Sequence, residues 1–226
     1  MKLMLALIPR SRRAKARQAF QAGDAVGFLT CASNTDHMAI VSDNLVQLKE
    51  RGIFEQALSH TFTRTRVNHF NWDFTVLDNM FELADPAKLR ACGDELPGDG
   101  PFTLYRGVCG TKRYRRRRGY SWTFSLDSAC WYACRLPRLD HPEVVTATVS
   151  SDNVLVFMNN RFGEEAIVRP WRCATVEMPT DEMRERAEAK ARAFTRQHEK
   201  RMAELMTNSN LILSRTIPEV FAQDLR

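Results

Sequence analysis

Apolar residues recur three and four positions apart through much of the first hundred residues. This spacing places them on one face of a helix. The helices it predicts are 14–22, 36–58, 72–83 and 86–89. Gly52 is expected to divide the second of these segments into two helices. Residues 1–100 are therefore predicted to be a helical region packed on the rest of the protein.

The pattern changes after 93–101, a stretch rich in glycine, proline and aspartate. Beyond it, apolar and polar residues alternate or β-branched residues cluster, which is typical of strands. The predicted strands are 102–108, 146–149, 154–158 and 166–168. A helix is expected at 127–135, with Asp127 as its N-cap. Residues 101–178 therefore form a strand-rich unit, and the chain as a whole is predicted to be α+β.

The remaining segment, 179–226, is dominated by one amphipathic pattern. Apolar residues return every three or four positions over 180–206 within a highly charged sequence, which predicts a long C-terminal helix. Asn208–Asn210 is expected to end it. The helix is expected either to pack on the protein's own body or to bind a partner.

The net charge of +6 is concentrated in two short segments. Residues 1–17 contain six basic side chains and no acidic one, and residues 112–118 contain six more, again with no acidic one. The rest of the chain carries an excess of acidic residues. Such segments are typical either of solvated surface loops or of contacts with phosphate groups.

The composition narrows the class of protein. Hydrophobic residues make up 44% and charged residues 27% of the 226 positions, as in globular proteins. No apolar run approaches the roughly 18–20 residues that a membrane span needs, so we expect none. The apolar residues 1–9 are followed, not preceded, by arginines, so we also expect no secretory signal. Six dispersed cysteines indicate a reduced, cytoplasmic protein, and no metal-ligand spacing is present.

Three short motifs in the strand-rich unit carry candidate chemistry. The first is an arginine followed by glycine, Arg106-Gly107, at the end of a predicted strand. The second alternates hydroxyls with aromatic rings and includes Ser121, Trp122 and Thr123. The third is a pair of glutamates, 164–165, which follows a polar turn and precedes an apolar strand.

The order and spacing of these motifs resemble the arginine–serine–glutamate class of mono-ADP-ribosyltransferases, over residues 102–168. The resemblance implies an ADP-ribosyltransferase-like split β-core that uses NAD⁺ as substrate and needs no metal. It implies that Arg106, Ser121 and Glu165 are catalytic. It also implies that NAD⁺ is bound by a set of neighbouring residues: Arg106, Gly107, Ser121, Trp122 and Thr123. Glu164 is the alternative catalytic glutamate.

The chemistry that the resemblance implies suits these residue types. Cleavage of the nicotinamide–ribose bond passes through an oxocarbenium-like species, which the carboxylate of Glu165 would stabilise. The guanidinium of Arg106 would hold phosphate or ribose oxygens. The hydroxyl of Ser121 would hold the glutamate or the ribose, with support from Thr123.

The acceptor is the least determined part of the resemblance. Members that modify arginine usually carry a glutamate two residues before the catalytic one, where this chain has Gly163. A nucleic-acid acceptor, RNA before DNA, fits the cationic segments, and a protein acceptor fits the family at large. Acceptor contacts are expected from the turn and from the arginine run: Asn159, Asn160, Arg161, Phe162, Arg115, Arg116 and Arg117.

Two other functions remain open on the same residues, an NAD⁺ glycohydrolase and a non-catalytic nucleic-acid-binding module. Enzymes of the resembled kind often act as toxins in conflict between bacteria and phage. A toxin of this kind would need an antitoxin partner.

Overall fold

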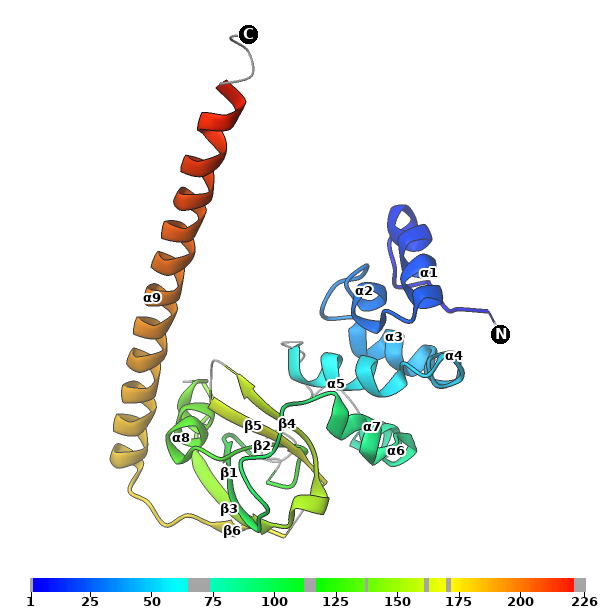
Figure 1. Cartoon of the computed structure of the whole chain (residues 1–226). Helices are drawn as coiled ribbons and strands as arrows, with labels where there is room; N and C mark the ends of the chain where they lie inside the picture. The colour runs from blue at the N-terminus through cyan, green and yellow to red at the C-terminus, as the bar shows by residue number, and fades with distance from the viewer. Residues whose placement is uncertain are drawn as a thin grey trace.

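The computed structural model describes residues 2–64, 74–111, 117–136, 138–160, 163–169 and 172–221 (Figure 1). Helices form the first part of the chain, a six-stranded sheet with one helix follows, and a long helix comes last. The predicted α+β class is confirmed. None of the helices within these ranges combines the length and apolar character that crossing a bilayer requires.

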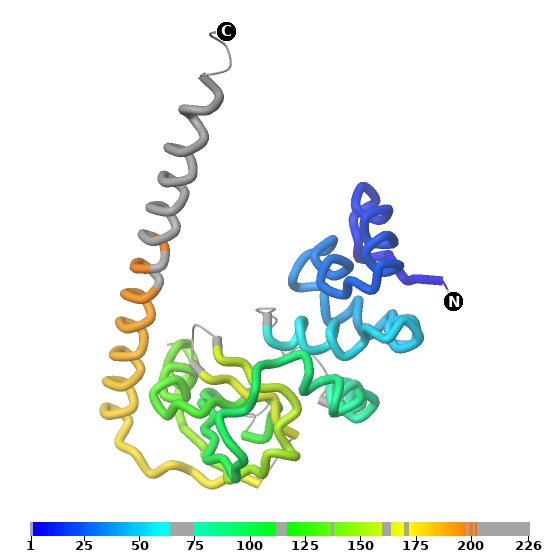
Figure 2. Tube along the Cα trace, in the orientation of Figure 1, coloured from blue at the N-terminus to red at the C-terminus, as the bar shows by residue number. Residues whose placement is uncertain are grey.

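The first part contains seven α-helices in the described ranges, and the trace through them is shown in Figure 2. They are α1 (Arg13–Ala22), α2 (Ala25–Leu29), α3 (His37–Asp43), α4 (Leu45–Arg51), α5 (Phe54–Arg64), α6 (Phe74–Leu83) and α7 (Pro86–Ala91), with a short 3₁₀ turn, Arg10–Arg12, before α1. Gly23 and Gly52 end α1 and α4 with φ angles of 77° and 76°, a conformation that glycine adopts without strain. The side chains of Asp24 and Asp85 cap α2 and α7 by accepting backbone N–H bonds.

The segment predicted as two helices over 36–58 forms three, because the chain also breaks at Asn44. The side chain of Asn44 is fully buried and donates to the carbonyl oxygens of Ile40 and Met4, at 2.9 Å and 3.0 Å. Its amide oxygen accepts from the backbone N–H of Met4 at 2.7 Å. The break therefore ties the segment before α1 to α3, a long-range contact that local periodicity does not contain.

The sheet is antiparallel, with the strand order β4-β5-β2-β1-β3-β6. Its strands are β1 (Phe102–Val108), β2 (Ser121–Thr123), β3 (Glu143–Val149), β4 (Val154–Asn160), β5 (Gly163–Val168) and β6 (Ala174–Thr175), with a 3₁₀ turn at Ser151–Asn153. Helix α8 (Leu126–Cys134) follows β2. It begins one residue earlier than predicted, and Ser125 is its N-cap in place of Asp127.

The two faces of the sheet pack against different layers. On one face, Val156 and Ile167 join the core of the helical region, while α8 packs on Tyr105 and Gly107 farther along the sheet. The other face forms its own apolar cluster, whose members include Leu104, Trp122, Val145, Phe157 and Ala166. The first face is thus covered by two separate helical layers.

The last helix, α9 (Thr180–Phe221), continues past Asn208–Asn210, so the predicted end of the helix is wrong. Its first turns pack on α8, where Met183 and Ala187 are buried with Ala129 and Cys130. Arg186 pairs with Asp127 at the start of α8, at 3.0 Å. The beginning of the helix therefore packs on the protein's own body, which is the first of the two alternatives that the sequence left open. At the other end of the described side chains, Met202 is 46% exposed.

Candidate active site

The three motif strands are neighbours in the sheet. Strand β2 lies between β1 and β5, so the serine motif is flanked by the arginine motif and the glutamate motif. Thr123 is the register partner of Tyr105 on one side and of Glu165 on the other. Residues separated by about sixty positions in the chain are brought together by this order.

The register separates the two glutamates. Partners across an antiparallel ladder share a face, and successive residues alternate between faces. Glu165 is opposite Thr123 and therefore lies on the face of Ser121, whereas Glu164 lies on the other face. Ser121 is the diagonal neighbour of Glu165, a position typically about 7–8 Å away. Of the two carboxylates, Glu165 is the one placed beside the serine.

Arg106 reaches the second motif from the opposite face. Its neighbour Tyr105 faces Thr123, so alternation directs Arg106 to the side of Trp122. Its guanidinium nevertheless donates from Nη1 to the backbone oxygen of Ser121 at 2.5 Å. A Cβ at Gly119 would lie 2.7 Å from its Nη2, so a side chain at 119 would crowd the guanidinium. Arg106 is therefore joined to the serine motif through the backbone of Ser121.

Tyr132 on α8 was not predicted as a site residue, yet it contacts Glu165 directly. Its hydroxyl donates a hydrogen bond to Oε1 of Glu165. Burial, and next the Glu165 carboxylate, raise the pKa of Tyr132, so the phenol remains a donor at neutral pH. The guanidinium of Arg135 lies 4.9 Å from the centre of the Tyr132 ring. The site thus contains a tyrosine–glutamate pair.

Gly107 explains how α8 comes close enough for this contact. A Cβ at position 107 would overlap the backbone carbonyl of Ala129 and crowd the backbone N–H of Ala133. The glycine therefore allows a close approach between β1 and α8. This packing role accounts for the residue without a cofactor contact. The sequence signal available for Tyr132 was its place on the helix that directly follows the serine motif.

Trp122 is one of the residues that the resemblance assigns to NAD⁺ binding, but its side chain is turned away from Ser121. It is 2% exposed and packs in the apolar cluster on the face opposite Ser121, while its Nε1 donates to the Gly119 carbonyl at 2.7 Å. Thr123 is also buried, and its hydroxyl accepts from the backbone N–H of Ser125 at 3.1 Å. Ser121, by contrast, is exposed, so it is the member of the motif whose hydroxyl faces solvent.

The predicted acceptor turn starts at the end of β4, at the edge of the sheet beside Glu165. The backbone N–H of Asn159, an exposed residue, donates to the carboxylate of Asp94 at 2.8 Å, and Asp94 in turn donates its N–H to the Phe157 carbonyl. The sequence did not single out Asp94. Asn160 pairs with Gly163 across the turn, and Arg161 and Phe162 lie outside the described residues.

Arg117, also predicted as an acceptor contact, does not lie at this edge. It pairs with Glu143 on β3 at 3.2 Å and donates to the hydroxyl of Thr175 on β6 at 2.7 Å. Strands β1 and β2 separate β3 from β5, so Arg117 serves as a link at the opposite side of the sheet. Arg115 and Arg116 lie outside the described residues.

Comparison with known proteins identifies no relative of this chain. No protein-family model matches the chain, and searches of the curated proteins and of the solved structures found no match. Among the described residues, no group of three or more histidine, cysteine, aspartate or glutamate side chains is placed to hold a metal ion.

Proposed function

We propose that the protein is an NAD⁺-dependent mono-ADP-ribosyltransferase that modifies a macromolecular acceptor. The single observation that supports it most is the order β5-β2-β1, which places the glutamate, serine and arginine motifs on three adjacent strands. The family resemblance requires these three strands to be neighbours, and nothing in local sequence demands it. Only Ser121 and Glu165 share a face, because the side chain of Arg106 starts on the opposite face and reaches the backbone of Ser121. Glu165, on the same face as the exposed Ser121, would supply the negative charge that the reaction needs.

The proposed reaction exchanges one bond at the ribose. The bond between the ribose C1′ and the nicotinamide nitrogen breaks, and its electron pair leaves with neutral nicotinamide. Glu165 would stabilise the positive charge that develops on the ribose. A nucleophilic atom of the acceptor then bonds to C1′ and releases its proton to the solvent. If water takes the place of the acceptor, the product is free ADP-ribose.

RNA is the acceptor class that we favour, with a protein target as the second candidate. The cationic segment 1–17 supports a polyanionic acceptor, and Gly163 stands where members that modify arginine usually carry a glutamate. In this proposal the enzyme is a cytoplasmic toxin of bacterial–phage conflict that an antitoxin partner holds in check.

The test uses the purified protein and NAD⁺ labelled in the adenylate part. The reaction is run with separate pools of total protein, RNA and DNA, and each pool is then separated by size. Label in the RNA pool is the expected result, and label in the protein pool would identify the second candidate. Release of free ADP-ribose with no labelled pool would indicate the glycohydrolase, and NAD⁺ that remains intact would refute the proposal.

Replacing Tyr132 by phenylalanine is expected to lower kcat about tenfold and to leave the KM for NAD⁺ nearly unchanged. The substitution removes the hydroxyl that donates to Glu165 and keeps the ring and the Cβ that lies close to Gly107. A hydrogen bond to a charged group typically contributes about 1.5–3 kcal/mol, which is enough to change the orientation of the carboxylate. Initial rates over a range of NAD⁺ concentrations measure both constants.

Tyr105→Phe is the matched control, because Tyr105 lies on the same face of the sheet and packs against α8. It is expected to retain the wild-type kcat. Equal losses in the two variants would show that Tyr132 acts through packing alone and not by positioning Glu165.

A further inference from the structure

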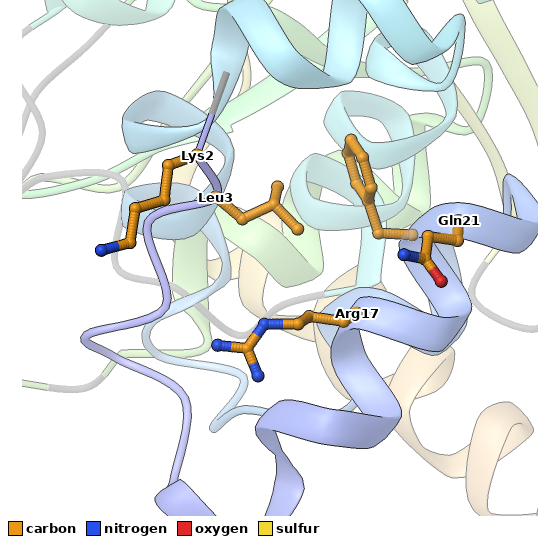
Figure 3. A pocket seen from close by; sticks show the side chains of 5 residues that line it. Lys2, Leu3, Arg17 and Gln21 are labelled. Atoms are coloured by element: carbon orange, nitrogen blue, oxygen red, sulfur yellow. The ribbon is translucent and has the colours of Figure 1, made fainter.

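A second candidate binding site lies between α1 and the segment that precedes it. Its hollow has a volume of about 290 Å³ and is lined by Lys2, Leu3, Arg17, Phe20 and Gln21. Figure 3 shows Leu3 pointing from the extended segment toward α1 and Arg17 pointing from α1 toward that segment, while the Lys2 side chain extends away from α1. In Figure 1, α1 lies at the end of the helical region remote from the sheet. The hollow is therefore separate from the site around Glu165.

Both walls of the hollow are held by hydrogen bonds, one wall by buried side chains and the other by an exposed arginine. The wall on the extended segment is tied by Asn44, as described above, and by the side-chain amide of Gln47, which donates to the Lys2 carbonyl at 3.1 Å. The wall on α1 is tied by the guanidinium of Arg51, which donates to the carbonyl oxygens of Phe20, at 3.2 Å, and Gln21. The hollow is thus a built feature of the helical region.

The charge around the hollow is unbalanced. Lys2 and Arg17 are exposed, and neither forms an ion pair with any residue in the described part of the chain. Three further exposed cations lie nearby in the sequence: Arg10 and Arg12 on the 3₁₀ turn before α1, and Lys15 on α1. Arg13 differs, because its guanidinium is used internally, bonding to the Ile8 carbonyl at 2.9 Å. The cations near the hollow are therefore available to an external anion.

The lining also offers groups that suit a nucleobase. Phe20 is half-buried, and its ring meets Phe28 edge to face, with the centroids 5.8 Å apart, so its position is fixed from behind. The exposed amide of Gln21 both donates and accepts hydrogen bonds, as base edges require. Proteins that bind single-stranded nucleic acid combine cations along the backbone with aromatic rings that contact the bases.

We propose that this hollow binds single-stranded RNA, with Lys2 and Arg17 on phosphates and with Phe20 and Gln21 on a base. The concave shape, the amide and the ring are the features of this hollow that suit a nucleotide. The inference deepens the proposed function, on which it rests for RNA as the acceptor. The site holds the acceptor strand at one end of the molecule, while another part of the strand reaches Glu165.

The test measures binding of a fluorescent single-stranded RNA of about twenty nucleotides to the full chain, by anisotropy over a range of salt concentrations. The double variant Lys2→Gln/Arg17→Gln is expected to bind about tenfold more weakly near 100 mM salt. Because single strands contribute a slope of about −0.7 per phosphate contact, the variant's salt dependence is expected to be shallower by about 1.4. Phe20→Leu is expected to weaken binding about fivefold without changing the salt slope.

Arg196→Gln/Lys200→Gln on α9 removes the same charge from another exposed surface and is the matched control. It is expected to bind like the wild type. Equal weakening by the two double variants would overturn the proposal, since net charge alone would then explain binding. Stronger binding to vesicles containing phosphatidylserine than to RNA would overturn it in favour of a membrane surface. The assay contains no NAD⁺, so its outcome and that of the transfer assay are independent.

Discussion

Replacing Glu165 by glutamine is expected to lower the rate of ADP-ribosyl transfer by about 100- to 1000-fold, the range typical for removal of one electrostatic group at a reacting centre. The amide keeps the shape of the side chain and can still accept the hydrogen bond from Tyr132. It lacks the negative charge that would stabilise the developing oxocarbenium ion. The loss is expected in kcat, measured as initial rates of label transfer from NAD⁺.

Glu164→Gln is the control for this prediction. Glu164 is adjacent in sequence, but strand alternation places it on the face away from Ser121. Its variant is expected to keep at least half of the wild-type rate. A reversed result, with Glu164 essential and Glu165 dispensable, would mean that the reaction takes place on the other face of the sheet. If neither variant loses activity, neither glutamate takes part in the reaction.

Replacing Trp122 by alanine is expected to reduce the free energy of unfolding by about 3–5 kcal/mol, the range for large aromatic residues removed from a core. The side chain is 2% exposed and fills the cluster with Leu104 and Phe157. Alanine would leave a cavity there and would remove the hydrogen bond to the Gly119 carbonyl. Urea denaturation followed by circular dichroism measures the change.

Trp131→Ala is the control for packing, because Trp131 is a half-buried tryptophan of α8. It is expected to cost clearly less than Trp122→Ala. Trp122→Phe retains most of the volume and is expected to leave the KM for NAD⁺ unchanged. A large rise in that KM, with stability intact, would restore Trp122 to the cofactor site and contradict the buried position described above.

Local pattern was sufficient for most of the elements. Strand β1 has the bounds that alternation predicted, 102–108. Phe102 and Leu104, two positions apart, pack in the same apolar cluster. The helices with strong apolar stripes were also found, with shifts at their ends. The break at Asn44 and the extension of α9 were missed, since the first depends on a partner forty residues away and the second lies in a polar stretch.

For the candidate site too, some features follow from the sequence and others only from the fold. The residue types of the three motifs, their order and their spacing are properties of the sequence, and the family resemblance that they carry is what implies NAD⁺ chemistry. The register decides which of two adjacent glutamates shares a face with Ser121, because a shift of one residue would exchange them. The tyrosine partner of Glu165 depends on how closely α8 approaches β1 at Gly107.

The sequence by itself determined the secondary-structure pattern, the two cationic segments and the identity of the candidate chemical groups, since all of these depend on neighbours along the chain. Only the tertiary structure decided that Arg117 is paired across β3 and β6, and that Arg106 meets the backbone of Ser121. The physical reason is that burial and ion pairing depend on which surfaces come into contact when strands and helices pack. Periodicity assigns a residue to a face, whereas packing determines what that face meets.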